Sequence, residues 1–357
     1  MKLLIDIGHP AHVHLFKNVA WEMQKNGHEI LFTCREKDVV RNLLDYCKFP
    51  YVTLGKHRSG TLSKLTGLIK FNLLLLRVAI KFKPNVFLSH GSFYAAQVAA
   101  LMRKPHISLE DTGNMEQIHL YRPFTQFILT PSCFHKYLGK KQFYHNSYHE
   151  LAYLGPNRFK PDPSIFSFLN LHPGDPYIIL RFISWKATHD IIHTGIPDIY
   201  KSELVNELSG YGRIFISSEK ELPEELQKYS IKIPAERMHD AMYYTSLFIG
   251  ESLTMVSECA MLGTPAIHVN TMTAGTLAEQ EKYGLIFRFS NTNGLLEKAV
   301  SLLKTEKLKE EWLRRRDLML RDKIDLSGLI VWVLENYPDS INILKNNPEY
   351  QQKFKFA

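Results

Sequence analysis

Cysteine is scarce in this chain, and its few residues are not spaced for a bridge or a metal site. No C-x-x-C pair occurs, so a disulfide framework or a zinc site built on cysteine is excluded. This composition is typical of a protein of the reducing cytoplasm, and we expect a cytoplasmic location. The four residues are Cys34, Cys47, Cys133 and Cys259.

Long hydrophobic runs are also missing. The most apolar stretch, "LTGLIKFNLLLLRVAIKF", contains Lys70 and Arg77, and no run reaches the roughly 20 apolar residues of a spanning helix. The first apolar run is interrupted by Asp6 and has no cleavage-type ending, so it does not resemble a signal peptide. Residues 64–83 are amphipathic and cationic. They fit either a peripheral membrane contact that collects a lipid-linked acceptor, or a packed helix with lysines at its solvent edge.

Internal repeats, low-complexity segments and nucleic-acid-binding motifs are absent as well. The 357 residues are 45% hydrophobic, and 44 Lys and Arg against 36 Asp and Glu leave a formal charge of +8. This composition indicates a globular protein long enough for two domains, with an excess charge that favours an anionic partner. The charge does not choose among a nucleotide, a phosphorylated lipid, a membrane surface and a nucleic acid, but the absence of a nucleic-acid-binding motif leads us to expect no nucleic-acid partner.

Short apolar runs alternate with helical patterns along the whole chain. "KLLIDI" is typical of a buried strand, residues 12–25 of an amphipathic helix, and "HEILFT" of the next strand. Such βαβ alternation predicts an α/β fold with parallel sheets. The Pro-rich segment "LGPNRFKPDPSIF" interrupts it and resembles a linker. We therefore predict two Rossmann-like domains facing across a cleft, 1–160 and 161–334, with the option that a helical tail, 335–357, packs back on the first.

The segment "LFIGESLTMVSECAMLGTPAIHV" carries the strongest functional pattern. A strand ends at Gly250, Glu251 and Ser252 form a short turn, and a helix begins near Leu253 or Thr254. Ser252 and Thr254 can cap this helix, whose free N–H groups suit a diphosphate. Glu258 lies one turn further on and can accept hydrogen bonds from ribose hydroxyls. The alternative is an ordinary capped helix in a βαβ unit.

This segment resembles the donor-nucleotide segment of glycosyltransferase-B (GT-B) enzymes. It is most similar to that of the bacterial cell-wall transferases that use UDP-N-acetylglucosamine, in which a small-residue turn, Leu-Thr, Ser-Glu and Gly-x-Pro hold UDP. The resemblance implies a ribose-binding role for Glu258, although the spacing from Thr254 is one residue longer here. The opening loop resembles the same family, with His12 fifteen residues before Gly27.

The opening loop implies a catalytic role. His9, Pro10 and Ala11 replace the family's glycines. By similarity, His12 faces the acceptor and is a candidate general base, with His9 beside it. Over nearly its whole length the chain looks like a GT-B family of unknown function whose members begin "IDIGHPAHVH"-like. Some members look like parts of surface-polysaccharide gene clusters, which implies polysaccharide biosynthesis.

Several further segments follow apolar runs and are expected near the site. "LRFISWKATHD" offers Arg181, Ser184 and Lys186 to phosphate, and the pair His189 and Asp190; capping of the next segment is the alternative. "LEDTG" offers Glu110 and Asp111 as acid or base, against a role in a turn. His239 is a candidate donor contact by similarity, although a surface role is the simpler interpretation. The expected site residues are His9, His12 and Asp111 for catalysis, and Arg181, Ser184, Lys186, His189, His239, Gly250, Glu251, Ser252, Thr254 and Glu258 for the donor.

No metal site or cofactor is expected. His145 and His149 in "YHNSYHE" have ligand-like spacing, but no third ligand is evident, and a solvated face is preferred. The Asp-x-Asp clamp of the other major transferase fold is absent. These patterns favour an inverting, metal-independent enzyme.

Three functions remain open. The first is a glycosyltransferase that moves a sugar from a nucleotide-sugar donor, UDP-linked by resemblance, to a polysaccharide or lipid-linked acceptor. The second is an enzyme of the UDP-N-acetylglucosamine 2-epimerase type, which shares the fold. The usual Gly-Thr-Arg-Pro-Glu opening of that type is absent. The third is a non-catalytic nucleotide-sugar-binding protein.

Overall fold

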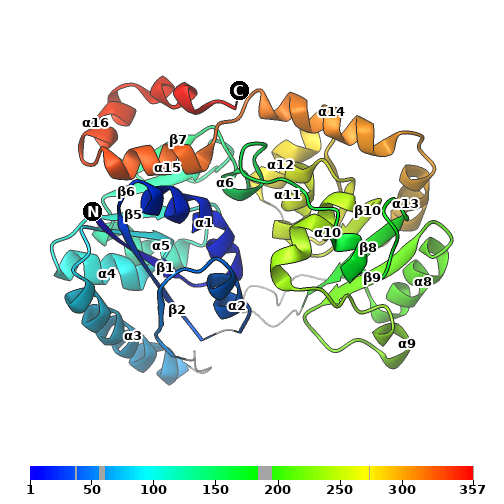
Figure 1. Ribbon diagram of the computed structural model, residues 1–357, viewed down its shortest axis with the longest axis horizontal. Helices are drawn as coiled ribbons and strands as arrows, with labels where there is room; N and C mark the ends of the chain where they lie inside the picture. The colour runs from blue at the N-terminus through cyan, green and yellow to red at the C-terminus, as the bar shows by residue number, and fades with distance from the viewer. Residues whose placement is uncertain (37, 56–60, 184–194, 273, 357) are drawn as a thin grey trace. The chain divides into compact units, whose positions relative to one another are not determined.

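The computed structural model describes residues 1–36, 38–55, 61–183, 195–272 and 274–356. The chain divides into two compact units (Figure 1). Unit 1 contains Met1–Arg158 and Lys323–Ala357, and unit 2 contains Phe159–Asp322. The first boundary lies inside the proline-rich segment. The chain returns to unit 1 at Lys323, earlier than residue 335, where the sequence pattern had placed the tail.

Unit 1 contains a parallel sheet with the strand order β3-β2-β1-β4-β5-β6-β7 in the described residues. The order reverses direction between β1 and β4, which is where doubly wound sheets bind ligands, at the carboxyl ends of the strands. The apolar runs "KLLIDI", "HEILFT", "NVFLSH", "PHISL" and "QFILTP" predict β1, β2, β4, β5 and β6 to within one residue at each end, whereas β3 and β7 were not predicted. The strands are β1 (Lys2–Ile7), β2 (Glu29–Cys34), β3 (Tyr51–Thr53), β4 (Val86–His90), β5 (His106–Leu109), β6 (Phe127–Pro131) and β7 (Gln142–His145).

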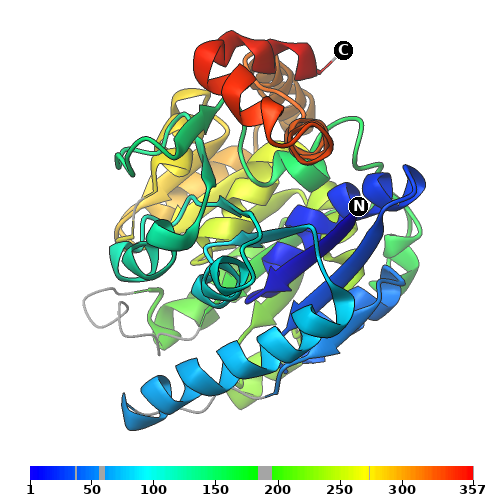
Figure 2. The same ribbon diagram turned by 90° about the vertical axis from the view of Figure 1, so that its left-hand side faces the viewer.

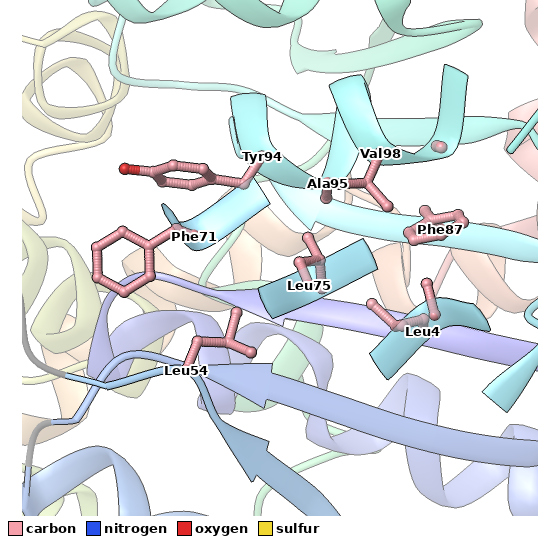
Figure 3. Packing of buried hydrophobic residues seen from close by; sticks show 10 residues of the cluster. Leu4, Leu54, Phe71, Leu75, Phe87, Tyr94, Ala95 and Val98 are labelled. Atoms are coloured by element: carbon pink, nitrogen blue, oxygen red, sulfur yellow. The ribbon is translucent and has the colours of Figure 1, made fainter. Parts of the chain in front are cut away.

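Helices cover both faces of this sheet, so its central strands are apolar on both sides. Leu4 of β1 and Phe87 of β4 pack against α3 and α4 in a cluster that includes Leu75 and Val98 (Figure 3). Neighbours of Leu4 in the strand point to the opposite face, where α1 and α15 lie. The helices of unit 1 are α1 (Pro10–Lys25), α2 (Asp38–Tyr46), α3 (Thr61–Phe82), α4 (Phe93–Leu101), α5 (Met115–Tyr121), η1 (Arg122–Phe124), α6 (Leu151–Leu154), α15 (Leu326–Glu335), α16 (Asp339–Asn346) and η3 (Pro348–Phe354).

Polar contacts tie the returning segment to unit 1. Asp325 caps α15 by accepting a hydrogen bond from the Gly328 N–H (3.2 Å). Its carboxylate also accepts from Nε of Arg158 (3.1 Å), which pairs in turn with Glu22 of α1. Ser327 donates to the carbonyl oxygen of Ala152 in α6 (2.8 Å). These contacts explain why unit 1 begins again at Lys323.

The α3 helix is the long light-blue helix at the lower front of Figure 2. Its outer face exposes Ile69, Leu73 and Ile80, with Lys70 and Arg77 among them. Its inner face packs in the core, as the packed-helix interpretation of this segment expects. Contact of the outer face with a membrane stays a prediction. No helix in the described part of the chain has the length and apolarity to cross a bilayer.

Unit 2 contains a second parallel sheet, with the order β12-β11-β10-β8-β9 among the described strands. The predicted α/β class with two parallel sheets is therefore confirmed. The reversal of strand order lies between β8 and β10. The elements are β8 (Tyr177–Phe182), β9 (Arg213–Ser218), β10 (Leu247–Gly250), β11 (Ala266–Val269), β12 (Ile286–Phe289), α7 (Ile165–Phe168), α8 (Asp198–Leu208), α9 (Glu224–Gln227), η2 (Ala235–Arg237), α10 (Met238–Tyr244), α11 (Leu253–Leu262), α12 (Gly275–Lys282), α13 (Leu295–Leu303) and α14 (Leu308–Leu320).

A buried carboxylate holds the centre of unit 1 together. Asp6, near the end of β1, is 1% exposed and accepts hydrogen bonds from Thr33 Oγ1 (2.7 Å) and Ser92 Oγ (2.5 Å). Both of its oxygens also accept from the Arg35 guanidinium (3.0 and 3.3 Å). That guanidinium lies over the rings of Phe71 and Tyr94, at 5.1 and 4.5 Å, which lie side by side in Figure 3.

We expect Asp6→Asn to lower the free energy of unfolding by about 3–5 kcal/mol, because it leaves a buried guanidinium without its counter-charge. Urea unfolding followed by circular dichroism measures this. Asp38→Asn is the control: Asp38 forms an exposed pair with Arg41 at 2.5 Å, and such pairs contribute little. Equal midpoints for the two variants would contradict the role of Asp6.

Candidate functional site

Four histidine and aspartate side chains gather where the strand order of unit 1 reverses. His12 lies in the first turn of α1, just after β1, and His90 ends β4. Asp111 follows β5, and His149 follows β7. The carboxyl ends of parallel strands share one sheet edge, which is why residues so distant in sequence meet here. The structure thus brings the predicted His12 and Asp111 together.

The first helix begins at Pro10, two residues earlier than predicted, and His12 lies in its first turn. His9 is the N-cap residue, and its Nδ1 accepts from the Ala11 N–H (3.2 Å). The rings of His9 and His12 are 6.0 Å apart, and the rings of His12 and His90 are 4.5 Å apart. His14, the third histidine of this segment, packs elsewhere, against the ring of Tyr153 at 5.5 Å.

Asp111 joins two of the histidines. Its Oδ1 is 2.9 Å from His90 Nε2, and its Oδ2 is 3.0 Å from His149 Nδ1. Burial alone would raise the pKa of Asp111, but the two imidazoles hold it well below its usual range. Burial opposes charging of His90, yet its hydrogen bond to Asp111 raises its pKa. Burial, followed by His90 and His9, holds the pKa of His12 well below its usual value, so its ring is neutral.

The interpretation of His145 and His149 as a solvated face is wrong. Both residues are buried, and their rings stack 5.7 Å apart. His145 ends β7 rather than lying on a helix. Burial holds the pKa of His145 well below its usual value. The error arose because β7 and the turn after it carry no apolar periodicity that distinguishes them from a surface helix.

Glu110 has a structural role, in agreement with the turn interpretation of "LEDTG". Its Oε1 accepts from the N–H groups of Thr112 (2.8 Å) and Gly113 (3.0 Å). Its Oε2 accepts from the Tyr121 hydroxyl at 2.9 Å. The carboxylate thereby shapes the turn that presents Asp111 and joins this turn to Tyr121 of α5.

The reversal point of unit 2 lies between β8 and β10, where Arg181 and Gly250 are partners in the parallel ladder. A Cβ on Gly250 would lie 2.8 Å from Arg181 Cβ and 3.2 Å from its carbonyl oxygen. Glycine is therefore required for the close approach of these strands. The Arg181 guanidinium donates to Ser217 Oγ (2.9 Å) and Glu219 Oε1 (2.5 Å). Burial lowers the pKa of Arg181, and nearby carboxylates, Glu258 among them, oppose this effect.

The helix predicted after β10 is confirmed as α11. Ser252 is its N-cap, with the side chain accepting from the Met255 N–H at 3.4 Å, and Thr254 lies in its first turn. Gly263 ends it in the left-handed conformation, with φ of 61°. The free N–H groups of α11 therefore start at the reversal point, where an anion is favoured.

His239 and Glu258 form a buried pair. Glu258 is 5% exposed, and its Oε1 lies 3.0 Å from His239 Nε2. The surface role preferred for His239 is therefore wrong, because this residue is buried in α10. The pairing gives Glu258 a structural partner, so a ribose-binding role would require its carboxylate to serve both groups.

Glu251 holds the backbone beside the reversal point. This buried carboxylate accepts from the N–H groups of Ile183 (2.7 Å) and Ile196 (2.6 Å). The geometry thus gives it a structural function. The other predicted donor contacts of the preceding loop, Ser184, Lys186 and His189, lie outside the described residues.

A pocket opens beside the ends of β8 and β9. Its polar lining includes two lysines and two carboxylates. The lining residues are Phe182, Ile183, Asp198, Lys201, Ser218, Lys220, Glu221, Leu222 and Pro223.

Sequence reasoning did not assign His90, His149 or the Asp6–Arg35 pair to this architecture. His90 is the last residue of the apolar run "NVFLSH", and this position at a strand end was the available signal. The spacing of His145 and His149 in the sequence suggested that these two residues form a metal pair, whereas the structure places His149 next to the Asp111 carboxylate. No local pattern relates Asp6 to Arg35, because the pairing depends on the neighbouring positions of β1 and β2.

The chain is similar in sequence to other proteins. A family profile described as "Protein of unknown function (DUF354)" matches residues 1–326. The uncharacterised protein MJ0665 of Methanocaldococcus jannaschii is 23% identical over 277 residues, which cover 74% of this chain and 80% of that protein.

Two solved structures are similar in fold. UDP-GlcNAc 2-epimerase from Neisseria meningitidis, bound to UDP-GlcNAc, aligns with a TM-score of 0.69 at 15% identity, covering 94% of this chain and 100% of that one. The Streptomyces sp. SF2575 glycosyltransferase SsfS6 aligns with a TM-score of 0.58 at 14% identity, covering 94% and 100%. The two parallel-sheet units and these likenesses identify the GT-B fold.

We expect Gly250→Ala to lower the free energy of unfolding by about 1–3 kcal/mol, because the added methyl group forces β8 and β10 apart. Denaturant titration measures this. Gly210→Ala is the matched control, since the nearest atom to its Cβ would be 4.0 Å away. An unchanged midpoint for Gly250→Ala would show that the strands can separate without cost.

Proposed function

We propose that this chain, which belongs to the DUF354 family of proteins of unknown function, is a nucleotide-sugar-dependent glycosyltransferase. Unit 2 binds the nucleotide part of the donor, and unit 1 supplies the side chains that act on the acceptor. The donor is UDP-linked, and the acceptor is a saccharide or a lipid-linked saccharide.

The reversal point of the unit 2 sheet is the observation that carries this proposal. It combines the N-terminus of α11, the Arg181 guanidinium at the end of β8, and the strand contact that only Gly250 permits. N–H groups and a guanidinium are suitable partners for a diphosphate. The adjoining pocket adds Lys201 and Lys220, together with the carboxylates Asp198 and Glu221, to the polar groups near this point.

The identity of the nucleotide is inferred by similarity. The similar epimerase structure is described as bound to UDP-GlcNAc, and the resemblance of the α11 segment to UDP-binding transferases agrees with this. In this proposal Ser252 and Thr254 lie beside the diphosphate, and Glu258, with His239, lies at the ribose.

His12 is the side chain that we propose accepts a proton from the acceptor hydroxyl. Its ring lies at the reversal point of the unit 1 sheet, between His9 and His90. An imidazole at such a position can act as a general base when the hydroxyl attacks the sugar. His9 is more exposed and lies at the entrance to α1, where it can contact the acceptor.

A second candidate function is epimerisation of the sugar without an acceptor. The observation that favours it is the number of titratable groups gathered in unit 1, namely His12, His90, Asp111 and His149. Epimerisation needs acids and bases around the sugar ring, for which the sequence alone suggested His9, His12, Glu110 and Asp111.

The donor site predicts that UDP binds to the chain and that Glu258→Gln weakens this binding about tenfold, the effect of losing one charge-assisted hydrogen bond. Calorimetric titration with UDP, GDP, CDP and dTDP measures affinity and identifies the base. Glu207→Gln, an exposed change in α8, should bind as the natural chain does. Absence of binding by all four nucleotides would refute the donor site.

The transferase proposal predicts that UDP is released from UDP-GlcNAc only when an acceptor is present, as measured by coupled UDP detection over a panel of saccharide and lipid-linked acceptors. His12→Ala should slow this release at least about 100-fold, the usual contribution of a general base, without weakening UDP binding. The exposed His119→Ala in α5 is the control. Conversion of the donor alone would favour the epimerase, and binding without turnover would favour a non-catalytic role.

A further inference from the structure

We propose that His90, Asp111 and His149 bind a divalent transition-metal ion. Their ligand atoms all lie within 4.8 Å of one another, and they come from three different strand ends of unit 1. This site is distinct from the nucleotide site proposed on unit 2, and its evidence does not depend on that proposal.

The distances match those between neighbouring ligands of a metal ion. Asp111 lies 2.9 Å from His90 Nε2 and 3.0 Å from His149 Nδ1. Ligands about 2.0–2.2 Å from one ion are separated from each other by about 3.0–3.4 Å. Each of the two nitrogens therefore already lies at about the distance from the carboxylate that is expected between neighbouring ligands. Metal binding would need only the ligand atoms that are further apart, up to 4.8 Å, to move closer together.

The orientation of the His149 ring favours a metal site over a triad that is held together only by hydrogen bonds. This residue is 5% exposed, yet neither of its ring nitrogens forms a hydrogen bond with any described residue. Its Nδ1 lies 3.0 Å from Asp111 Oδ2 but is not aligned for a hydrogen bond with that oxygen. A buried polar atom without a partner is costly, and a shared ion would satisfy it.

Neighbouring rings hold the donor set in place. The Asp111 carboxylate lies between His90 and His149. The rings of His12 and His145 pack against His90 and His149, with centroids 4.5 and 5.7 Å apart, respectively. The two donor rings are therefore fixed beside the carboxylate.

The donor atoms indicate the class of metal. Two imidazole nitrogens and one carboxylate oxygen suit Zn²⁺ and other divalent first-row metals, whereas Mg²⁺ and Ca²⁺ prefer oxygen ligands throughout. Three protein ligands leave coordination positions for water or for a hydroxyl of a substrate. The sequence pattern indicated no metal because His145 and His149 lacked a third ligand; in this proposal Asp111 and His90 are the partners of His149.

Titration of the chelator-treated full chain with Zn²⁺, Co²⁺ or Mg²⁺ alone, without nucleotide, tests this site. We expect one Zn²⁺ or Co²⁺ per chain, with visible Co²⁺ absorption bands, and binding of Mg²⁺ at least about 100-fold weaker. Asp111→Asn and His149→Gln should each weaken Zn²⁺ binding at least about 100-fold, since they remove ligands. Circular dichroism of each variant confirms that it is folded.

His119→Gln, which removes an exposed histidine of α5, is the matched control and should bind Zn²⁺ as the natural chain does. Failure of the natural chain to bind Zn²⁺ or Co²⁺ at one per chain would overturn the proposal. So would unchanged affinity in folded Asp111→Asn and His149→Gln. Because the titration contains no nucleotide, its result is separate from that of the UDP experiment, which tests unit 2.

Discussion

The buried interaction of Asp6 with Arg35, Thr33 and Ser92 is the constraint on which the architecture of unit 1 depends. It joins the end of β1 to the end of β2 and to the N-cap of α4. These are the elements that border the reversal of strand order. A carboxylate in such a position is stable only when its hydrogen bonds are satisfied, so it allows one arrangement of β1, β2 and α4.

The polar cluster of unit 1 is built on this frame. Ser92 directly follows the β4 turn that carries His90, and Asp6 directly precedes the turn into α1 that carries His12. Glu110 positions Asp111 by accepting hydrogen bonds from the N–H groups of the turn that follows it. Two buried carboxylates thus position the groups available for chemistry. In unit 2, the end of β10 is ordered by the close strand contact at Gly250 and by the hydrogen bond that Glu251 accepts from the Ile183 N–H.

Much of this architecture could be predicted from local patterns. Runs such as "KLLIDI" predicted the parallel strands because both of their faces are buried. Ser252 and Gly263 predicted the two ends of α11 because capping and the left-handed conformation are local requirements. The predictions were wrong where burial depends on distant partners: His145, His149 and His239 are all buried, although their neighbours in sequence are polar.

The sequence by itself determined the α/β class, most strands and the candidate positions of His12, Asp111 and Ser252, because periodicity, capping and strand ends are encoded within a few residues. Only the tertiary structure decided which of these groups meet. The pairing of Asp111 with His90 and His149, of Glu258 with His239, and of Asp6 with Arg35 follows from the order of strands in each sheet. That order is set by the packing of the whole unit, and residues close in space there are far apart along the chain.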